Sequence, residues 1–258
     1  MNGLWLETYE MARRSIIKVL RQPALVAPSI LFPLIMMGIN VSGLDAATHI
    51  PGFPTDSYLD FAIAFPMIQS ALFASINAGS SVARDVETGF LNRLALTPMQ
   101  RGAMLLGLFA GEMLVAFAST LIYLVVGFAL GLSFASGVGG VLVLLALCVL
   151  IALAFAALGA FIGLRTGSPE AVQGVFPMLF VFLFLSSSSL PRDLIEHDWF
   201  RIVATWNPVS YMFEGLRSLI IFGWQARELA LGFGFAGAIA VLGVFGATSA
   251  LRTRVAVR

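Results

Sequence analysis

The chain has 258 residues, of which 59% are hydrophobic and only 11% are charged, with a formal net charge of +1. Soluble domains carry about 25% charged residues, so this composition predicts a membrane protein. The nearly neutral charge and the lack of a basic cluster give no indication of a nucleic-acid partner. The single cysteine, Cys148, lies in an apolar run, so we expect a small buried side chain there and no internal disulfide.

Residues 2–21 predict one amphipathic helix that lies on the membrane surface, because apolar and charged positions recur on opposite sides at helical spacing. The apolar positions are Trp5, Tyr9, Ala12, Ile16 and Val19, and the charged positions are Glu7, Glu10, Arg14, Lys18 and Arg21. Pro23 ends this element, which we assign to residues 1–24. A cleaved signal peptide is the competing interpretation, but its apolar region has only about 7–15 residues, and the apolar run here is longer.

The remaining residues, 25–258, predict an all-α domain of six transmembrane helices. The predicted spans are residues 25–44, 59–83, 102–132, 139–164, 171–190 and 229–251. Each reaches about the 20 residues that a membrane-spanning helix needs. Glycines four residues apart predict close helix packing, mainly within the chain. These pairs are Gly107/Gly111, Gly127/Gly131 and Gly159/Gly163.

The placement of basic residues predicts the orientation in the membrane. Eleven of the 15 lysine and arginine residues fall on the side that holds both termini, and the other side has only four. Those four are Arg192, Arg201, Arg217 and Arg227. By the positive-inside rule, both termini and the loop at 84–101 are cytoplasmic.

The loop at 84–101 is a charged, amphipathic stretch between two apolar runs, and it predicts a short helix along the cytoplasmic surface. Its polar positions are Asp85, Glu87, Asn92 and Arg93, and its apolar positions are Phe90, Leu91 and Leu94. Thr97 followed by Pro98 is typical of the cap and first residue of the next helix. A soluble partner could bind such a helix; an ordinary loop is the alternative.

Residues 191–228 predict an external helical segment. Pro191–Phe200 has the mixed composition of a short interfacial helix, and Asn207 and Pro208 predict the start of another helix, which Gly223 ends. That helix has about 15 residues and a length of roughly 22 Å, shorter than a hydrocarbon core of about 30 Å. It is therefore re-entrant or lies on the outer surface. Glu214 and Arg217, three residues apart, are expected to pair on one face.

The sequence predicts no enzymatic site, and it offers neither catalytic nor metal-binding residues. Lys18 is the only lysine and is not part of a phosphate-binding loop, so this chain lacks its own ATPase motif. His49 and His197 are far apart, without a metal-ligand spacing. Glu112 is the one carboxylate well inside a predicted span, where it either lines a route through the bundle or braces the helices. If Glu112→Gln leaves both transport and stability unchanged, neither role holds.

Two motifs resemble the permease subunits of type-2 ABC transporters, close to the daunorubicin/doxorubicin-resistance export permeases. The first is Glu87-Thr88-Gly89, followed by Arg93-Leu94 and Thr97-Pro98. The second is Asn207-Pro208, followed by Tyr211, Glu214 and Arg217. The predicted spans, the N-terminal helix and the loop lengths agree with this family over essentially the whole chain.

This resemblance implies a function for each predicted segment. Residues 84–101 would be a coupling helix on a separate ATPase subunit, which would bind the ATP and Mg, and residues 1–24 a connecting helix. The coupling residues would be Glu87, Gly89, Phe90, Arg93, Leu94, Thr97 and Pro98, and the external gate would be Asn207, Pro208, Tyr211, Glu214 and Arg217. A second copy or a related permease would complete the path. The chain is then expected in a bacterial plasma (inner) membrane, exporting lipophilic or amphipathic compounds.

Three other functions stay open at this point. A permease of the same type could export a polysaccharide or glycolipid through a wide channel lined by aromatic residues. A secondary carrier would need no ATPase, and its transport would survive ATP depletion. A membrane scaffold would transport nothing, and the resemblance of its charged loop to a coupling helix would be coincidental.

Overall fold

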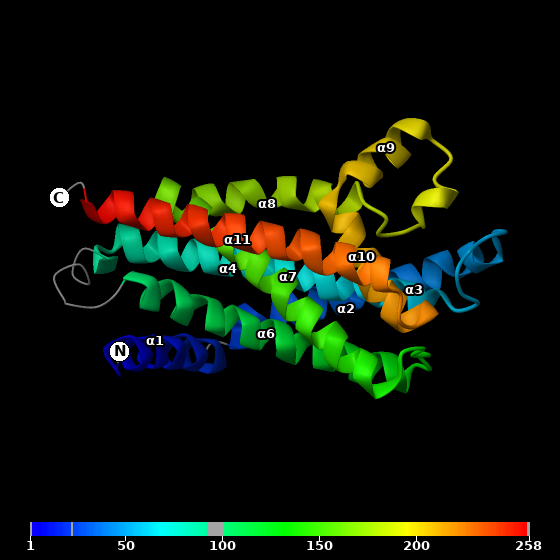
Figure 1. Cartoon of the computed structure of the whole chain (residues 1–258), viewed down its shortest axis with the longest axis horizontal. Coiled ribbons are helices and arrows are strands. Elements are labelled where there is room, and N and C mark those ends of the chain that lie inside the picture. Colours follow the sequence, from blue (N-terminus) through cyan, green and yellow to red (C-terminus); the bar gives the residue numbers. More distant parts are fainter. Residues whose placement is uncertain (1, 22, 92–100, 257–258) are drawn as a thin grey trace.

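The computed structural model describes residues 2–21, 23–91 and 101–256, which form a bundle of long helices without a β-strand in these ranges (Figure 1). The helix α1 (Asn2–Arg21) begins and α11 (Ala226–Ala256) ends at the same end of the bundle, which we call the terminal end. At the opposite end lie the short helices α3 (Tyr58–Ala62), α9 (Asp198–Trp206) and α10 (Pro208–Arg217). The all-α prediction is confirmed.

Five stretches of the described chain are long and apolar enough to cross a membrane, and they match five of the predicted spans. They cover Ala27–His49, Tyr58–Glu87, Gly102–Ala129, Gly137–Thr166 and Ala226–Arg254. The helices that form them are α2 (Pro23–Leu44), α3 with α4 (Ala64–Glu87), α6 (Arg101–Ala129), α7 (Gly137–Thr166) and α11.

The predicted span at 171–190 is shorter than expected. Its helix, α8 (Pro169–Phe184), has 16 residues, which at 1.5 Å per residue gives about 24 Å. The helix stops at Phe184 because a run of serines follows, and Ser186, Ser187 and Ser188 form a buried turn. The part of the predicted span after Phe184 is therefore not helical.

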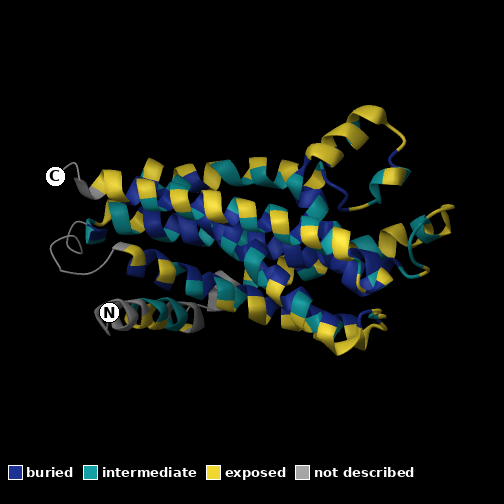
Figure 2. Ribbon diagram, viewed as in Figure 1, coloured by how far each residue is buried: buried dark blue, intermediate teal, exposed yellow. Residues whose placement is uncertain are grey.

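The centre of the bundle is α4, which contacts α2, α6, α7 and α8. Figure 2 shows its buried residues inside the bundle and exposed residues along the outer helices. Those outer surfaces carry large apolar side chains, including Val125, Leu142 and Phe245, which are 67%, 65% and 75% exposed. Exposed apolar surface on this scale is typical of helices that contact lipid.

Small residues let α4 and α7 approach closely. A Cβ atom at Gly159 would lie 1.8 Å from the carbonyl oxygen of Ser75, and one at Gly163 would lie 2.2 Å from that of Gly79. No other residue type fits at such a separation, so this predicted glycine pair packs within the chain, as expected.

The other two glycine pairs differ. Gly107 and Gly111 face α1, where added Cβ atoms would lie 2.3 Å from the Met11 Cβ and 2.3 Å from the Ser15 Oγ, so this pair also packs within the chain. The prediction for Gly127/Gly131 is wrong. Because α6 ends at Ala129, Gly131 lies in the following turn with a φ of 94°, where it continues no helix face.

Residues 191–228, predicted to be external, contain more short elements than expected. The first predicted helix is replaced by a 3-10 turn (Arg192–Leu194) and by α9, which starts only at Asp198. The second begins as expected at Pro208 and continues from α10 into a π-helical turn (Ser218–Phe222). It ends at Gly223, whose φ of 89° is unfavourable for residues with a side chain.

Candidate functional site

Arg217 joins three segments at the opposite end of the bundle. Its side chain is buried, with its Nε donating to the Phe61 carbonyl oxygen at 3.0 Å and its two terminal nitrogens donating to the carbonyls of Ser187 and Ser188. The guanidinium carbon lies 3.4 Å from the centre of the Phe61 ring and 4.9 Å from that of Phe213. Burial lowers the pKa of Arg217 to about 9, so the group stays charged at neutral pH.

Glu214 does not pair with Arg217, and that prediction is wrong. Glu214 forms a 2.6 Å ion pair with Arg192 instead, because the nitrogens of Arg217 already donate to carbonyls. Arg192 also lies over the ring of Tyr211, with its guanidinium carbon 4.5 Å from the ring centre. Burial raises the pKa of the Glu214 carboxyl, and the Arg192 charge opposes this shift.

Asn207 connects the end of α8 to the start of α10. Its Nδ2 donates to the carbonyls of Phe182 at 2.6 Å and Leu185 at 3.0 Å, while its Oδ1 accepts from the backbone nitrogen of Val209 at 3.0 Å. The predicted cap is therefore confirmed, with Pro208 as the first helical residue. The five predicted gate residues thus lie on one short helix and its cap, and their role as a gate stays a prediction.

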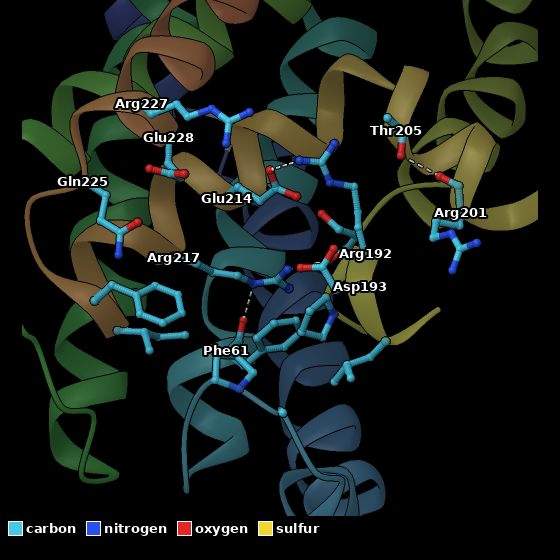
Figure 3. Close-up of a pocket in the computed structure, with 17 residues that line it drawn as sticks. Phe61, Arg192, Asp193, Arg201, Thr205, Glu214, Arg217, Gln225, Arg227 and Glu228 are labelled. Atoms are coloured by element: carbon cyan, nitrogen blue, oxygen red, sulfur yellow. Dashed lines mark hydrogen bonds and ion pairs between the residues drawn. The ribbon is translucent and has the colours of Figure 1, made fainter. Parts of the chain in front are cut away.

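A cavity of about 570 Å³ lies beside α10, and we call it the α10 cavity. Figure 3 shows charged side chains from α10, from the 191–205 segment and from the start of α11 around one space. The basic side chains that line it are Arg192, Arg201, Arg217 and Arg227, and the acidic ones are Asp193, Glu214 and Glu228. All four arginines of the less basic side of the chain therefore meet here. Of the four, only Arg217 was predicted to belong to a site.

Seven phenylalanine rings form a continuous row along α2, α4, α8 and α10, with consecutive ring centres 4.8–6.5 Å apart. In order, the members of this phenyl row are Phe32, Phe73, Phe176, Phe180, Phe184, Phe65 and Phe213. Phe32 and Phe184 are 41% and 52% exposed, whereas Phe213 is buried against Arg217. The row thus runs from an exposed apolar surface to the α10 cavity wall at Arg217. The sequence showed abundant phenylalanine but not this alignment.

At the terminal end, α1 contacts the stretch predicted to be the coupling helix. Arg14, predicted on the charged outer side of α1, forms a 3.7 Å ion pair with Asp85 and lies 4.4 Å from the centre of the Phe90 ring. The stretch itself differs from expectation, because α4 continues to Glu87 and a left-handed Gly89 with a φ of 68° follows. Glu87 is exposed at the last position of α4. The predicted coupling residues Arg93, Leu94, Thr97 and Pro98 lie outside the described residues.

Glu112 is buried within α6. It directly follows Gly111, at which this helix contacts Ser15 of α1. Its role in a route or in bracing stays a prediction. Within residues 2–21, 23–91 and 101–256, no three side chains of the metal-binding types form a cluster.

The helix bundle, its apolar exposed surfaces and its five candidate spans define a multi-pass membrane protein. The sequence model of the ABC-2 type transporter family matches residues 7–221, and the chain belongs to that family.

Curated relatives are similar at modest identity. The chain is 28% identical over 176 residues to the daunorubicin resistance ABC transporter permease protein DrrB1 of Streptomyces coeruleorubidus, covering 64% of this chain and 59% of that protein. It is 27% identical over 157 residues to a doxorubicin resistance ABC transporter permease protein, DrrC, of Mycobacterium tuberculosis. That match covers 59% of this chain and 56% of DrrC. A ycf38 transport permease of Cyanophora paradoxa is 24% identical over 234 residues, which cover 83% of this chain and 73% of that protein. The chain therefore spans less than two thirds of the length of the two drug-resistance permeases.

Proposed function

We propose that this chain is the transmembrane subunit of an ATP-driven exporter of lipophilic or amphipathic compounds. A separate ATPase subunit binds ATP and Mg, and a second copy or a related permease completes the path. The family supports a permease role. The drug-resistance names of two relatives support export of lipophilic compounds.

The phenyl row is the observation that carries the proposed cargo class. A lipophile in the membrane meets the exposed rings of Phe32 and Phe184 and exchanges lipid contacts for aromatic ones. Successive ring centres are no more than 6.5 Å apart, so a compound that lies on one accessible ring of the row also reaches the neighbouring ring. The polysaccharide alternative predicts a wide channel lined by aromatic residues, whereas the rings of the phenyl row pack against one another, with centres no more than 6.5 Å apart.

The ATPase subunits drive the conformational change by acting on the terminal end of the bundle. Closure of the ATPase subunits displaces the segment after Glu87, and Arg14 transmits the movement to α1 through Asp85 and Phe90. The rigid α4–α7 pair tilts as one unit, because backbone contacts at Gly159 and Gly163 leave no room for sliding. The bundle then exchanges an inward-open for an outward-open arrangement, with α10 at the external gate.

Transport in proteoliposomes tests the cargo class. The permease is reconstituted with its co-purified ATPase subunit, and ATP-dependent movement of a lipophilic fluorescent dye is followed. We expect Phe180→Ala, in the middle of the row, to lower the transport rate several-fold. Phe245→Ala is the matched control, since this ring is 75% exposed on α11 outside the row. Equal rates for the two variants would contradict the role of the phenyl row.

A further inference from the structure

The α10 cavity combines a charged lining, in which four arginines face three carboxylates, with an apolar wall. The same space as the four arginines is also lined by apolar side chains, namely Pro54, Phe61, Pro191, Leu194, Ile221 and Phe222. Phe222 is 55% exposed, so this wall is available to a ligand. A cavity with both kinds of lining suits a molecule that has a charged and an apolar part.

Arg217 places a positive charge in the cavity lining that no carboxylate neutralises directly. It is only 4% exposed, and its hydrogen bonds all go to backbone carbonyls. In the described part of the chain, no carboxylate lies within ion-pair distance of its guanidinium. A charge in such a poorly solvated position attracts an anion more strongly than a surface arginine does.

The other arginines differ in how far they are already paired. Arg192 is neutralised by Glu214, and Arg201 pairs with Asp198. Arg227 is exposed at the start of α11, and its guanidinium forms no hydrogen bond or ion pair with residues 2–21, 23–91 or 101–256. Its donors are thus available to a ligand in the cavity, where Figure 3 shows the side chain near those of Glu228 and Glu214.

The carboxylates of the cavity limit what the ligand can be. Glu214 is occupied by Arg192, whereas Asp193 is exposed and Glu228 is partly exposed. These two oppose a bare anion and would accept a hydrogen bond from a hydroxyl or ammonium group next to the anionic one. The lining therefore favours a substituted anionic group, such as a phosphate ester, over a simple inorganic ion.

We propose that the α10 cavity binds the anionic head group of an amphiphile, with Arg227 donating to the anion, the buried charge of Arg217 attracting it from the cavity wall, and Phe222 on the adjoining apolar part. The proposal deepens the proposed function, on which it rests, by giving the amphipathic cargo a negative charge. Membrane phospholipid and exported cargo are two sources of the same chemistry.

Binding to the purified full-length chain in a neutral detergent tests this inference without any ATPase subunit. The probe is dihexanoyl phosphatidic acid, and isothermal titration calorimetry gives its Kd. Dihexanoylglycerol has the same chains without the phosphate, and inorganic phosphate is the head group without the chains. We expect phosphatidic acid to bind at least about tenfold more tightly than either of them, since charge-assisted hydrogen bonds are among the strong ones.

Variants locate the site. Arg227→Gln is expected to weaken binding of phosphatidic acid about tenfold, and Phe222→Ala several-fold. Arg252→Gln, which removes an exposed arginine at the terminal end, should leave the Kd unchanged. Equal affinity for phosphatidic acid and dihexanoylglycerol, or an unchanged Kd in Arg227→Gln, would overturn the proposal.

Native mass spectrometry then separates the two sources. A phospholipid that stays bound during ATP turnover with the partner subunit identifies membrane lipid, whereas an anionic amphiphile that is lost only with ATP identifies cargo. Both results support the anionic site. Binding of phosphatidic acid in a chain that shows no ATP-driven transport would keep this inference and refute the proposed function.

Discussion

At the scale of single residues, Arg217 acts as a clamp, by which we mean that its one side chain holds three separate segments together. One guanidinium joins α10 to α3 and to the serine turn after α8, through three carbonyls and two rings. These segments are far apart in the sequence, so the arrangement of the opposite end of the bundle depends on this side chain. Buried carbonyls without a donor each cost about 1–3 kcal/mol.

Arg217→Met should therefore destabilise the protein strongly. The methionine keeps the apolar contacts with the rings but leaves the three carbonyls without their donor, so we expect a loss of at least about 3 kcal/mol. Thermal unfolding in detergent measures the change. Arg201→Met is the control, because its ion pair with Asp198 is exposed, and exposed pairs contribute about 0–1 kcal/mol. Similar melting temperatures for the two variants would show that Arg217 is not a clamp.

At the scale of elements, the contact between α4 and α7 decides the packing of the bundle. Ser75 and Gly79 on α4 meet Gly159 and Gly163 on α7 at distances that only backbone atoms can share. Adding a methyl group there would force the helices apart, and overpacking costs about 1–3 kcal/mol.

Gly159→Ala is expected to lower the melting temperature and the yield of folded protein, because its Cβ would lie 1.8 Å from a backbone oxygen that cannot move alone. The matched control is Gly237→Ala in α11, where no atom lies within 4 Å of an added Cβ. That variant should be neutral or slightly stabilising, as alanine favours helices over glycine by about 1 kcal/mol. A neutral Gly159→Ala would contradict the close packing.

The sequence was most informative where a local pattern determines an element. Five spans, the α1 bounds, the Asn207 cap and the end at Gly223 follow from hydrophobic length and capping chemistry, which are local properties. The end of α8 at Phe184 was not predicted. Residues 171–190 are apolar enough overall to predict one continuous span, although the serines after Phe184 form a turn.

The candidate site was harder to predict, because its contacts join distant segments. Glu214 and Arg217 are three residues apart in the sequence. Only the tertiary structure shows that Glu214 pairs with Arg192 and that Arg217 donates to three backbone carbonyls. The phenyl row likewise draws members from four helices, so no periodicity within one helix could show it.

At the scale of the whole molecule, the α4–α7 pair connects the two ends of the bundle. The Arg14 contacts lie at the terminal end, and the predicted gate residues lie at the opposite end. The ion pair between Arg14 and Asp85 is partly exposed, so it adds little to stability. A contact of this kind can change partners during a cycle at small energetic cost. Such an exchangeable ion pair is expected in a segment that moves together with the proposed ATPase subunit.

Charge reversal at Glu87 should uncouple ATP hydrolysis from transport. Glu87 is exposed at the end of α4, so Glu87→Arg is expected to fold normally and to change only the surface offered to the partner. We expect the ratio of molecules transported to ATP hydrolysed to fall several-fold in proteoliposomes. Glu196→Arg, at an exposed position in the opposite end, should keep the ratio of the unmodified protein. An unchanged ratio in Glu87→Arg would remove this residue from the coupling surface.

Purification from native membranes in a mild detergent, with mass spectrometry of the co-purified proteins, tests the central claim most directly. The proposed function predicts a near-stoichiometric second subunit that has the phosphate-binding lysine motif this chain lacks, and ATP hydrolysis by the isolated complex. Recovery of this chain alone in several detergents, with nucleotide present, and transport that survives ATP depletion would contradict it.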